Sequence, residues 1–214
     1  MKSYFEQKLS YTDDGRLLGE DGRAIMMEWE TEIMKFQAKH ICQKGGDILN
    51  VGFGMGIMDN YIETCNINSH TIIEPHPDVI AKIMKDGWLK KPHVKVIFKT
   101  WQEVMYYLPK YDGIYIDTWD EMFTGFIEYA PNILKPNGIL SFFNNPLDDK
   151  TGDHLPDVYR DFIYEHFNIN FEEMPIPFIP PPAAQSGTEA NIYWSQKNKI
   201  YFSPILTLKN NNFS

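Results

Sequence analysis

The sequence has few cysteines, no long apolar run and fewer basic than acidic residues. Its two cysteines, Cys42 and Cys65, are too few for a disulfide framework and do not have the spacing of a metal site. We therefore expect reduced thiols in a cytoplasmic protein. No apolar stretch approaches the ~20 residues that cross a bilayer, and the first residues carry charge where a signal peptide is apolar. These absences disfavour a membrane-spanning or secreted protein.

The charge balance bears on the kind of partner. Lys and Arg number 20 against 29 Asp and Glu, which gives a formal net charge of −9. Nucleic-acid affinity comes mainly from Lys and Arg, so we expect no nucleic-acid partner. The densest basic stretch, residues 82–95, is interrupted by Asp86 and by apolar residues, and a solvated helix and loop explain it better. An acidic surface is compatible with a cationic substrate.

Strand-like and helix-like segments alternate along the middle of the chain. The expected strands are 47–51, 70–73, 94–98, 113–116 and 139–143, and the helices between them are 57–64, 77–86, 102–107 and 122–134. A helix over 26–42 precedes them, from apolar residues at helical spacing. Later we expect a helix over 158–166, a strand over 169–174, and a hairpin or final strand pair from 192–194 and 200–205. This order predicts an α/β fold: a doubly wound, mostly parallel seven-stranded sheet with a C-terminal antiparallel strand pair.

The 214 residues fit one domain, because no linker or repeat divides them. Two Asp-Gly-Arg turns within residues 1–24 indicate an N-terminal hairpin or wrapped arm, which is a candidate lid over a site. Residues 209–214 are typical of a frayed tail.

A glycine-rich turn follows the first strand of the expected sheet. Residues 49–56 read Leu-Asn-Val-Gly-Phe-Gly-Met-Gly, and the next strand ends on Glu74. The glycines permit positive φ and close approach of a ligand to the backbone. A carboxylate at the tip of the next strand can accept two hydrogen bonds from a ribose diol. The pattern indicates a nucleoside site, and the alternative is an ordinary βα turn without a ligand.

The spacing of the glycines indicates which nucleoside. A dinucleotide fingerprint has Gly-x-Gly-x-x-Gly leading into a helix that faces a pyrophosphate. Here the glycines fall at i, i+2 and i+4, with Phe53 and Met55 between them, and no Lys or Arg lies near the turn. Bulky apolar residues suit an uncharged edge such as the methionine part of S-adenosylmethionine.

Two further carboxylates and an aromatic–amide pair are candidates for chemistry. Asp117 ends the fourth strand, where open α/β sheets bind ligands, and the alternative is an N-cap of the next helix. Glu30 lies beside the apolar stripe of the first helix, and the alternative is a solvated helix position. Trp101 and Gln102 follow the third strand, where a ring can pack on an adenine while an amide reads its edge.

Six motifs occur in a fixed order along the chain. They are Met27-Glu28-Trp29-Glu30-Thr31, Val51-Gly52-Phe53-Gly54-Met55, Ile72-Ile73-Glu74, Trp101-Gln102-Glu103-Val104, Tyr115-Ile116-Asp117-Thr118 and Leu134-Lys135-Pro136-Asn137-Gly138. In this order they resemble the guanidinoacetate N-methyltransferases and the related protein-arginine δ-N-methyltransferases, over roughly residues 5–205. The Trp-Glu-Thr element and the Gly-Phe-Gly-Met loop are specific to this group.

The resemblance implies a Rossmann-like methyltransferase that uses S-adenosylmethionine and releases S-adenosylhomocysteine. The implied cofactor-binding residues are Gly52, Phe53, Gly54 and Met55 along the ligand, Glu74 on the ribose, Trp101 and Gln102 at the adenine, and Asp117. Gln102 stands where the guanidinoacetate enzymes have Glu, and its amide oxygen can still accept from the adenine amino group.

The resemblance also implies the chemistry of the acceptor. Glu30 and Asp117 match the two carboxylates that grip the guanidino group. A guanidinium is a poor nucleophile while protonated, and two carboxylates can hold its planar fork and aim one nitrogen at the sulfonium methyl. Either carboxylate is a candidate base for the proton that the nitrogen loses. The reaction requires no metal and no covalent nucleophile.

The loop after the fifth strand bears on which guanidino compound is methylated. In the guanidinoacetate enzymes consecutive backbone N–H groups there bind the substrate carboxylate. Asn145 and Pro146 fall at those positions here, and proline has no N–H to donate. The preceding Ser-Phe-Phe-Asn, which ends at Asn144, is more similar to the arginine enzymes, although these usually carry an N-terminal domain that the 214 residues do not include.

We therefore favour an arginine-like acceptor, free or in a peptide, bound by Glu30, Asp117, Asn144, Asn145 and Tyr193. A guanidinoacetate N-methyltransferase that makes creatine is the first alternative, and a catalytically silent S-adenosylmethionine-binding domain is the second. A small acceptor predicts that the arm and the segment around Tyr193 cover the site, whereas a protein acceptor predicts an open cleft. We expect no membrane partner, and the oligomeric state stays open.

Overall fold

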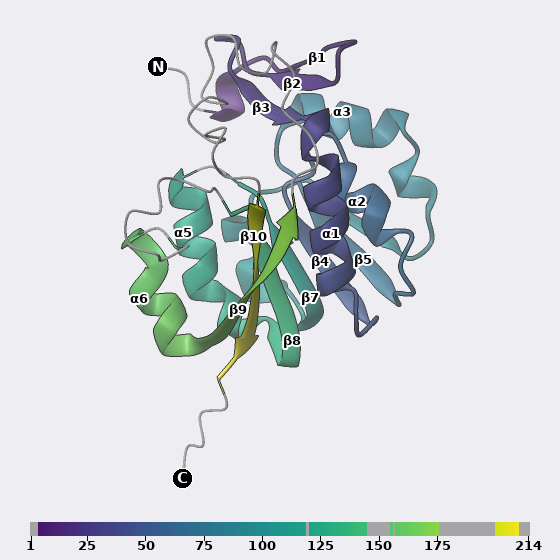
Figure 1. Ribbon diagram of the computed structural model, residues 1–214. Coiled ribbons are helices and arrows are strands. Elements are labelled where there is room, and N and C mark those ends of the chain that lie inside the picture. Colours follow the sequence, from purple (N-terminus) through teal and green to yellow (C-terminus); the bar gives the residue numbers. More distant parts are fainter. Residues whose placement is uncertain (1–3, 119, 145–154, 156, 176–199, 210–214) are drawn as a thin grey trace.

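A twisted sheet runs through the centre of the molecule (Figure 1). The computed structural model describes residues 4–118, 120–144, 155, 157–175 and 200–209. Within these residues the sheet has seven strands in the order β6-β5-β4-β7-β8-β10-β9. They are β4 (Asp47–Val51), β5 (Ser69–Ile73), β6 (Val94–Ile97), β7 (Tyr111–Ile116), β8 (Leu134–Phe142), β9 (Phe167–Pro175) and β10 (Ile200–Leu208).

The first five strands of this sheet are parallel, and β10 is antiparallel to both β8 and β9. The predicted α/β class, the mostly parallel sheet and the C-terminal antiparallel pair are therefore confirmed. Strand β8 begins five residues earlier than the sequence indicates, because Leu134 already pairs with Tyr111 before an irregularity in the register. The expected strand 192–194 lies outside the described residues.

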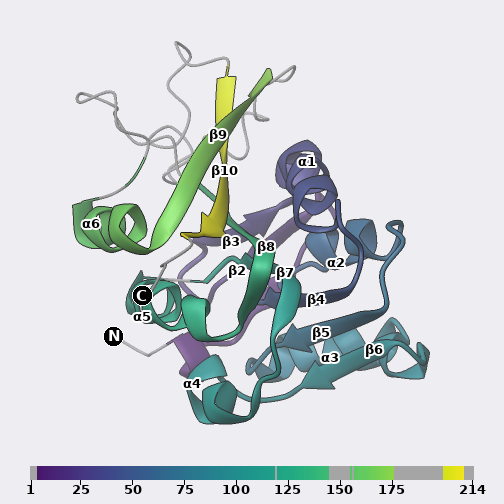
Figure 2. The same ribbon diagram turned by 90° about the horizontal axis from the view of Figure 1, so that it is seen from below.

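Helices cover both faces of the sheet (Figure 2). Helices α1 (Thr31–Ile41), α2 (Ile57–Ile62) and α3 (Pro77–Lys85) share one buried cluster with Ile48, Ile72 and Tyr115. Helices α4 (Trp101–Val104), α5 (Asp120–Tyr129) and α6 (Asp157–His166) share a second cluster with Leu49 and Ile114. Neighbouring strand residues thus face opposite cores, as expected for a doubly wound sheet. Short 3₁₀ turns complete this part: η3 (Trp88–Lys90), η4 (Met105–Tyr107) and η5 (Ala130–Asn132).

The predicted helix over 26–42 is wrong in its first part. Residues Ala24–Met27 form strand β3, residues Glu28–Glu30 form the 3₁₀ turn η2, and α1 begins only at Thr31. Met26 and Met27 pair with Leu17 and Arg16 of β2 (Arg16–Leu18). The helical spacing of Met26 and Trp29 is therefore overridden by a strand pairing that sequence periodicity does not detect.

The N-terminal arm forms a small antiparallel sheet, β1-β2-β3, preceded by the turn η1 (Tyr4–Glu6). The hairpin of β1 (Ser10–Tyr11) and β2 confirms the predicted hairpin. This sheet lies at the end of the molecule where the parallel strands terminate (Figure 1). The Tyr11 hydroxyl donates to the carbonyl oxygen of Gly54 at 2.9 Å, and the Leu9 N–H donates to Asp78 Oδ2 at 2.8 Å.

The structure also bears on the expected frayed tail and on membrane-spanning segments. The Lys209 N–H donates to the His166 carbonyl oxygen at 3.0 Å, and the rest of the expected tail, 210–214, lies outside the described residues. No helix in the described part of the chain is long and apolar enough to cross a membrane.

Candidate active site

A cavity of about 290 Å³ lies where β4, β5 and β7 end, beneath the N-terminal sheet. The described residues that line it come from the arm, from the ends of the parallel strands and from three other segments. They are Tyr4, Ala24, Ile25, Met26, Met27, Trp29, Glu30, Val51, Gly52, Gly54, Ile73, Glu74, Pro75, Thr100, Trp101, Asp117, Thr118 and Phe143. The crevice predicted at the carboxyl ends of the strands is therefore present.

The glycine-rich turn has the predicted left-handed backbone, with φ of +95° at Gly52 and +53° at Gly54. The Gly52 N–H donates to the Ile73 carbonyl oxygen at 2.9 Å. A Cβ atom on Gly52 would lie 2.5 Å from the Asp117 carbonyl oxygen. Glycine is thus required at this position by the close approach of two strand ends as well as by its φ.

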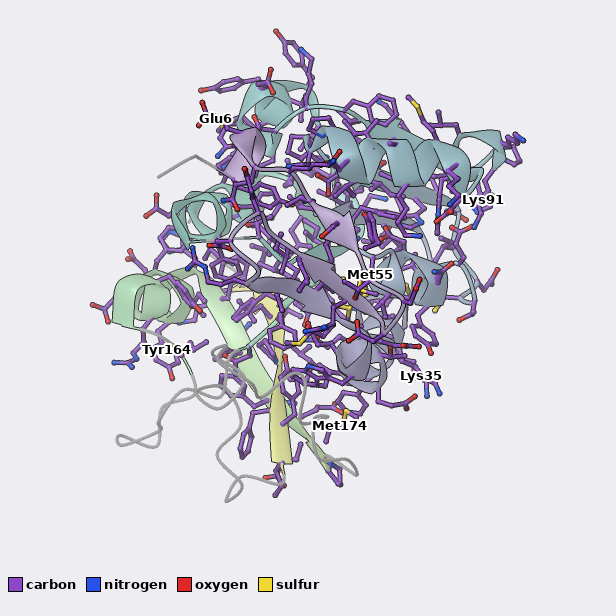
Figure 3. All side chains as sticks on the ribbon, turned by 90° about the horizontal axis from the view of Figure 1, so that it is seen from above. Glu6, Lys35, Met55, Lys91, Tyr164 and Met174 are labelled. Carbon is purple, nitrogen blue, oxygen red and sulfur yellow. The ribbon has the colours of Figure 1, made fainter. Side chains whose placement is uncertain are left out.

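The side chains between the glycines are not part of the described cavity lining. Phe53 is buried and packs edge-on against Trp88, with ring centroids 5.4 Å apart. The Met55 N–H meets the Met26 sulfur at 3.1 Å beside the N-terminal sheet (Figure 3). Neither side chain is among the described residues that line the cavity. The loop therefore presents the backbone of its glycines to the cavity, while Phe53 anchors it to the core.

Glu74 faces the cavity and also fastens the loop. Its Oε2 accepts from the Phe53 N–H at 2.9 Å, and its Oε1 accepts from the His76 N–H at 2.8 Å. Burial raises the pKa of Glu74, and these backbone N–H groups partly oppose that rise. A carboxylate has about four acceptor sites, so the predicted bonds to a diol can form beside the two bonds to backbone.

A buried polar cluster supports the loop from behind. The Asn50 amide donates to the Gly52 carbonyl oxygen and to Asp59 Oδ1, both at 2.9 Å. The His70 ring lies between Asp59 Oδ1 at 3.1 Å and Glu63 Oε1 at 3.0 Å. Burial acts to lower the pKa of His70, but the two carboxylates outweigh it and raise that pKa. The loop is therefore held by hydrogen bonds on both sides.

Glu30 lies in η2, immediately before α1, and only 7% of its surface is exposed. Its Oε1 accepts from the Met27 N–H at 2.9 Å. Burial and the nearby charge of Asp117 raise its pKa well above the usual value. The alternative that Glu30 is a solvated helix position is wrong.

Asp117 follows the last residue of β7, and its N–H donates to the Val51 carbonyl oxygen at 3.1 Å. Burial raises the pKa of Asp117 to about 6. Helix α5 begins three residues later, at Asp120, so Asp117 does not directly precede that helix. The buried Glu30 and the half-buried Asp117 thus share one cavity, which is a favourable arrangement for a cation.

Trp101 and Gln102 take different places. Trp101 lines the cavity, packs edge-on against Phe126 at 5.5 Å and lies nearly parallel to Tyr129 at 6.2 Å. Gln102 is exposed on α4 and is not one of the described lining residues. The structure therefore brings the ring, but not the amide, to the cavity.

Two groups of lining residues are named for the predicted roles of the segments that carry them. We call Gly52, Gly54, Glu74 and Trp101 the loop side, and Trp29, Glu30, Asp117 and Phe143 the carboxylate side. Trp29 and Phe143 pack against one small cluster formed by Ile33, Met174 and Tyr201.

A family model described as guanidinoacetate N-methyltransferase matches residues 2–177. The chain belongs to this family. Among its relatives, a protein arginine N-methyltransferase 2 from Yarrowia lipolytica is 36% identical over 79% of this chain and 39% of its own length. The protein of the same name from Kluyveromyces lactis is 36% identical over 75% of this chain and 42% of its own length. This member of the guanidinoacetate N-methyltransferase family therefore spans about two fifths of the length of these relatives.

The fold also occurs in distant methyltransferases. The crystal structure of a precorrin-6y C5,15-methyltransferase from Geobacter metallireducens superposes with a TM-score of 0.58, at 17% identity, over 83% of this chain and 88% of that chain. The likeness supports a Rossmann-like methyltransferase fold for this family member.

The remaining predicted acceptor residues are only partly described. Asn144 is buried, outside the described cavity lining, and its Nδ2 donates to the Phe202 carbonyl oxygen at 3.1 Å. Asn145, Pro146 and Tyr193 lie outside the described residues.

Tyr4, Phe143 and Thr118 are among the lining residues that the sequence did not indicate as site residues. Tyr4 packs on His76, with ring centroids 5.0 Å apart, and the charges of Glu74 and Asp117 add to burial in raising the pKa of its hydroxyl. A sequence signal for Tyr4 is its place in the arm, which is a candidate lid over the site.

Proposed function

We propose that this chain transfers a methyl group from S-adenosylmethionine to a guanidino nitrogen of an arginine-like acceptor. The observation that carries the proposal is the pairing of Glu30 and Asp117 in one cavity, directly beside the glycine-rich loop and Glu74. A general nucleoside site would have no need of two buried carboxylates whose charges oppose each other.

The loop side fits the cofactor. The backbone of Gly52 and Gly54 leaves room for a ligand close to the chain, and Glu74 offers acceptors for a ribose diol. The Trp101 ring supplies an apolar wall for an adenine. When bound, S-adenosylmethionine supplies an electrophilic methyl group on its sulfonium.

The carboxylate side fits a guanidinium. Its planar fork donates several hydrogen bonds in fixed directions, which two carboxylates can accept at once. The cation also neutralises the charges that burial disfavours at Glu30 and Asp117, so its entry lowers the pKa of both carboxylates and releases protons.

The same two residues account for the proton balance. One N–H bond of the guanidino group is lost as the new N–CH₃ bond forms, and the proton passes to Asp117 or Glu30 and then to solvent. The S–CH₃ bond of the sulfonium would break, its electron pair would stay on sulfur, and S-adenosylhomocysteine would leave. Holding the nitrogen in line with the methyl group can by itself lower the barrier by several kcal/mol.

An arginine-like acceptor is favoured by two observations. The relatives at 36% identity are named protein arginine N-methyltransferase 2. Pro146 also lacks the N–H that a guanidinoacetate carboxylate would need. Guanidinoacetate is the second candidate, because the matching family model carries that name.

Mass spectrometry of methyl transfer to arginine, an arginine-containing peptide and guanidinoacetate tests the proposal. We expect a gain of one methyl mass on the arginine-like acceptors and less on guanidinoacetate. Binding of S-adenosylmethionine by calorimetry without transfer to any guanidino compound would favour the catalytically silent alternative, and absence of binding would contradict the proposal altogether.

Pro146→Gly separates the two acceptors. It restores a backbone N–H, and a hydrogen bond to a charged group contributes about 1.5–3 kcal/mol. We expect the ratio of kcat/KM for guanidinoacetate to that for arginine to rise about tenfold. An unchanged ratio would remove the missing N–H as the reason for the preference.

A further inference from the structure

A buried polar network lies behind the carboxylate side. The Gln37 amide in α1 is fully buried, and its Nε2 donates to the Phe142 carbonyl oxygen at 2.6 Å and to the Tyr201 hydroxyl at 3.1 Å. Its Oε1 accepts from the Tyr115 hydroxyl at 2.9 Å. Both ends of the amide are therefore engaged, which fixes its orientation.

Tyr201 connects this network to the wall of the cavity. Its hydroxyl oxygen accepts from the N–H of Asn144, two residues after the end of β8, at 2.8 Å. Its ring also packs against Phe143, with centroids 5.9 Å apart. Phe143 lines the cavity, so Tyr201 holds this wall residue both by its ring and through the next backbone N–H.

The network also joins the segments that carry the two carboxylates. Helix α1, which contains Gln37, begins directly after Glu30. Tyr115 precedes Asp117 by two residues in the β7 segment, and such residues lie on the same side of a strand. The charges of both carboxylates add to burial in raising the pKa of the Tyr201 hydroxyl.

The loop side is held by different groups. In the described residues the hydrogen bonds of Glu74 and of the Gly52 backbone go to other groups than those of the network. Their partners are Phe53, Gly54, His76, Ile97, Ile73 and Asn50. We therefore expect a substitution in the network to displace residues of the carboxylate side more than those of the loop side.

We propose that Tyr201 is a positioning residue for the acceptor: its hydroxyl sets the place of Phe143 and Asn144 relative to Glu30 and Asp117. This inference rests on the proposed function. A buried network whose hydrogen bonds are all made specifies one geometry. Removal of the Tyr201 hydroxyl oxygen takes a hydrogen-bond partner from the Asn144 N–H and from one Gln37 N–H. The acceptor would then be misaligned while the cofactor still binds.

Tyr201→Phe tests the proposal, with Tyr111→Phe as the matched control. Tyr111 is also a buried tyrosine, but it lies at the opposite end of β7, where its hydroxyl bonds to Thr71. We expect Tyr201→Phe to lower kcat/KM for the acceptor by about ten- to a hundredfold, since small misplacements of reacting groups cost this much. The calorimetric Kd for S-adenosylmethionine should stay within about twofold, and the control should change neither quantity by more than about threefold.

The outcomes separate the two claims. Absence of turnover in the wild-type protein contradicts the proposed function. The positioning role alone is contradicted if the wild-type protein turns over and Tyr201→Phe leaves the acceptor kcat/KM unchanged. It is also contradicted if Tyr111→Phe lowers that kcat/KM equally, or if Tyr201→Phe weakens cofactor binding as much as it lowers acceptor kcat/KM.

If Tyr201→Phe does not fold by thermal melting, Tyr115→Phe replaces it. This change removes only the hydroxyl that orients the Gln37 amide. We expect a smaller loss in acceptor kcat/KM, again at unchanged cofactor Kd, and no loss would contradict the proposal.

Discussion

The loop side and the carboxylate side of the cavity are built in different ways. Glu74 on the loop side accepts from the backbone N–H groups of Phe53 in the glycine-rich turn and of His76, two residues after it. On the carboxylate side, Glu30 and Asp117 come from distant segments, and the charge of Asp117 raises the pKa of Glu30. The Glu74 carboxylate is thus held by backbone N–H groups, whereas under the proposed function the carboxylate side is stabilised by the cation of the acceptor.

The largest expected effect comes from removing the charge of Asp117 or of Glu30. We expect Asp117→Asn and Glu30→Gln each to lower turnover by about 10²–10⁴-fold, because the acceptor is no longer held or deprotonated. The Kd for S-adenosylmethionine, measured by calorimetry, should change only a few-fold. Unchanged turnover in either variant would remove that residue from the mechanism.

The converse test is Glu74→Gln on the loop side. The new amide NH₂ must face the backbone N–H of Phe53 or His76, and an unmatched buried donor costs about 1–3 kcal/mol. We expect cofactor affinity to fall about ten- to a hundredfold, while KM for the acceptor at saturating cofactor stays nearly constant. Glu32→Gln, exposed on α1, is the control, and a selective effect of Glu74→Gln on the acceptor would contradict the division into two sides.

Acceptor binding should weaken as the pH falls through about 6, where Asp117 takes up a proton. A guanidinium binds the ionised carboxylates, so protons compete with it and are released when it enters. Calorimetry in two buffers with different ionisation enthalpies measures this release. Binding of the acceptor with no proton release near pH 6 would place it away from Asp117 and Glu30.

The smallest effect is on stability. A carboxyl whose folded-state pKa is raised destabilises the protein above that pKa, and the penalty disappears as the pH falls below the unfolded-state value near 4.3. Glu30→Gln removes the charge but keeps an oxygen for the Met27 N–H. We expect the Tm without ligands to rise by roughly 2–6 °C at pH 8 and to be unchanged near pH 4. A lower Tm of Glu30→Gln than of the wild-type protein at pH 8 would show that favourable interactions in the folded protein offset the cost of burying the Glu30 charge.

Sequence reasoning located the loop side better than the carboxylate side. The order of strand, glycine turn and Glu74 is local, and the positive φ of Gly52 follows from residue type. The direction of Phe53 could not be predicted, because its packing partner Trp88 lies outside the motif. Gln102 is predicted at the adenine from its place after the third strand and from the resemblance, and it lies exposed on α4.

The carboxylate side depends on contacts that periodicity cannot detect. Glu30 was read as part of a helix because Met26 and Trp29 have helical spacing, whereas Met26 pairs with β2. Gln37 and Tyr201 form their bond across 164 residues of sequence. Long-range pairings of this kind override local propensity, so the family resemblance was the principal guide to Glu30.

The place of β10 has a consequence for the order in which the molecule forms. This strand comes last in the described chain, yet it lies between β8 and β9 and pairs with β9 over its whole length. Until it is synthesised, β9 has no neighbour in the sheet, and long-range strand pairing is slow. During synthesis, the strands β4, β5 and β7 can therefore pair early, whereas the strand pairing behind Phe143 is completed only after residue 208 has been added.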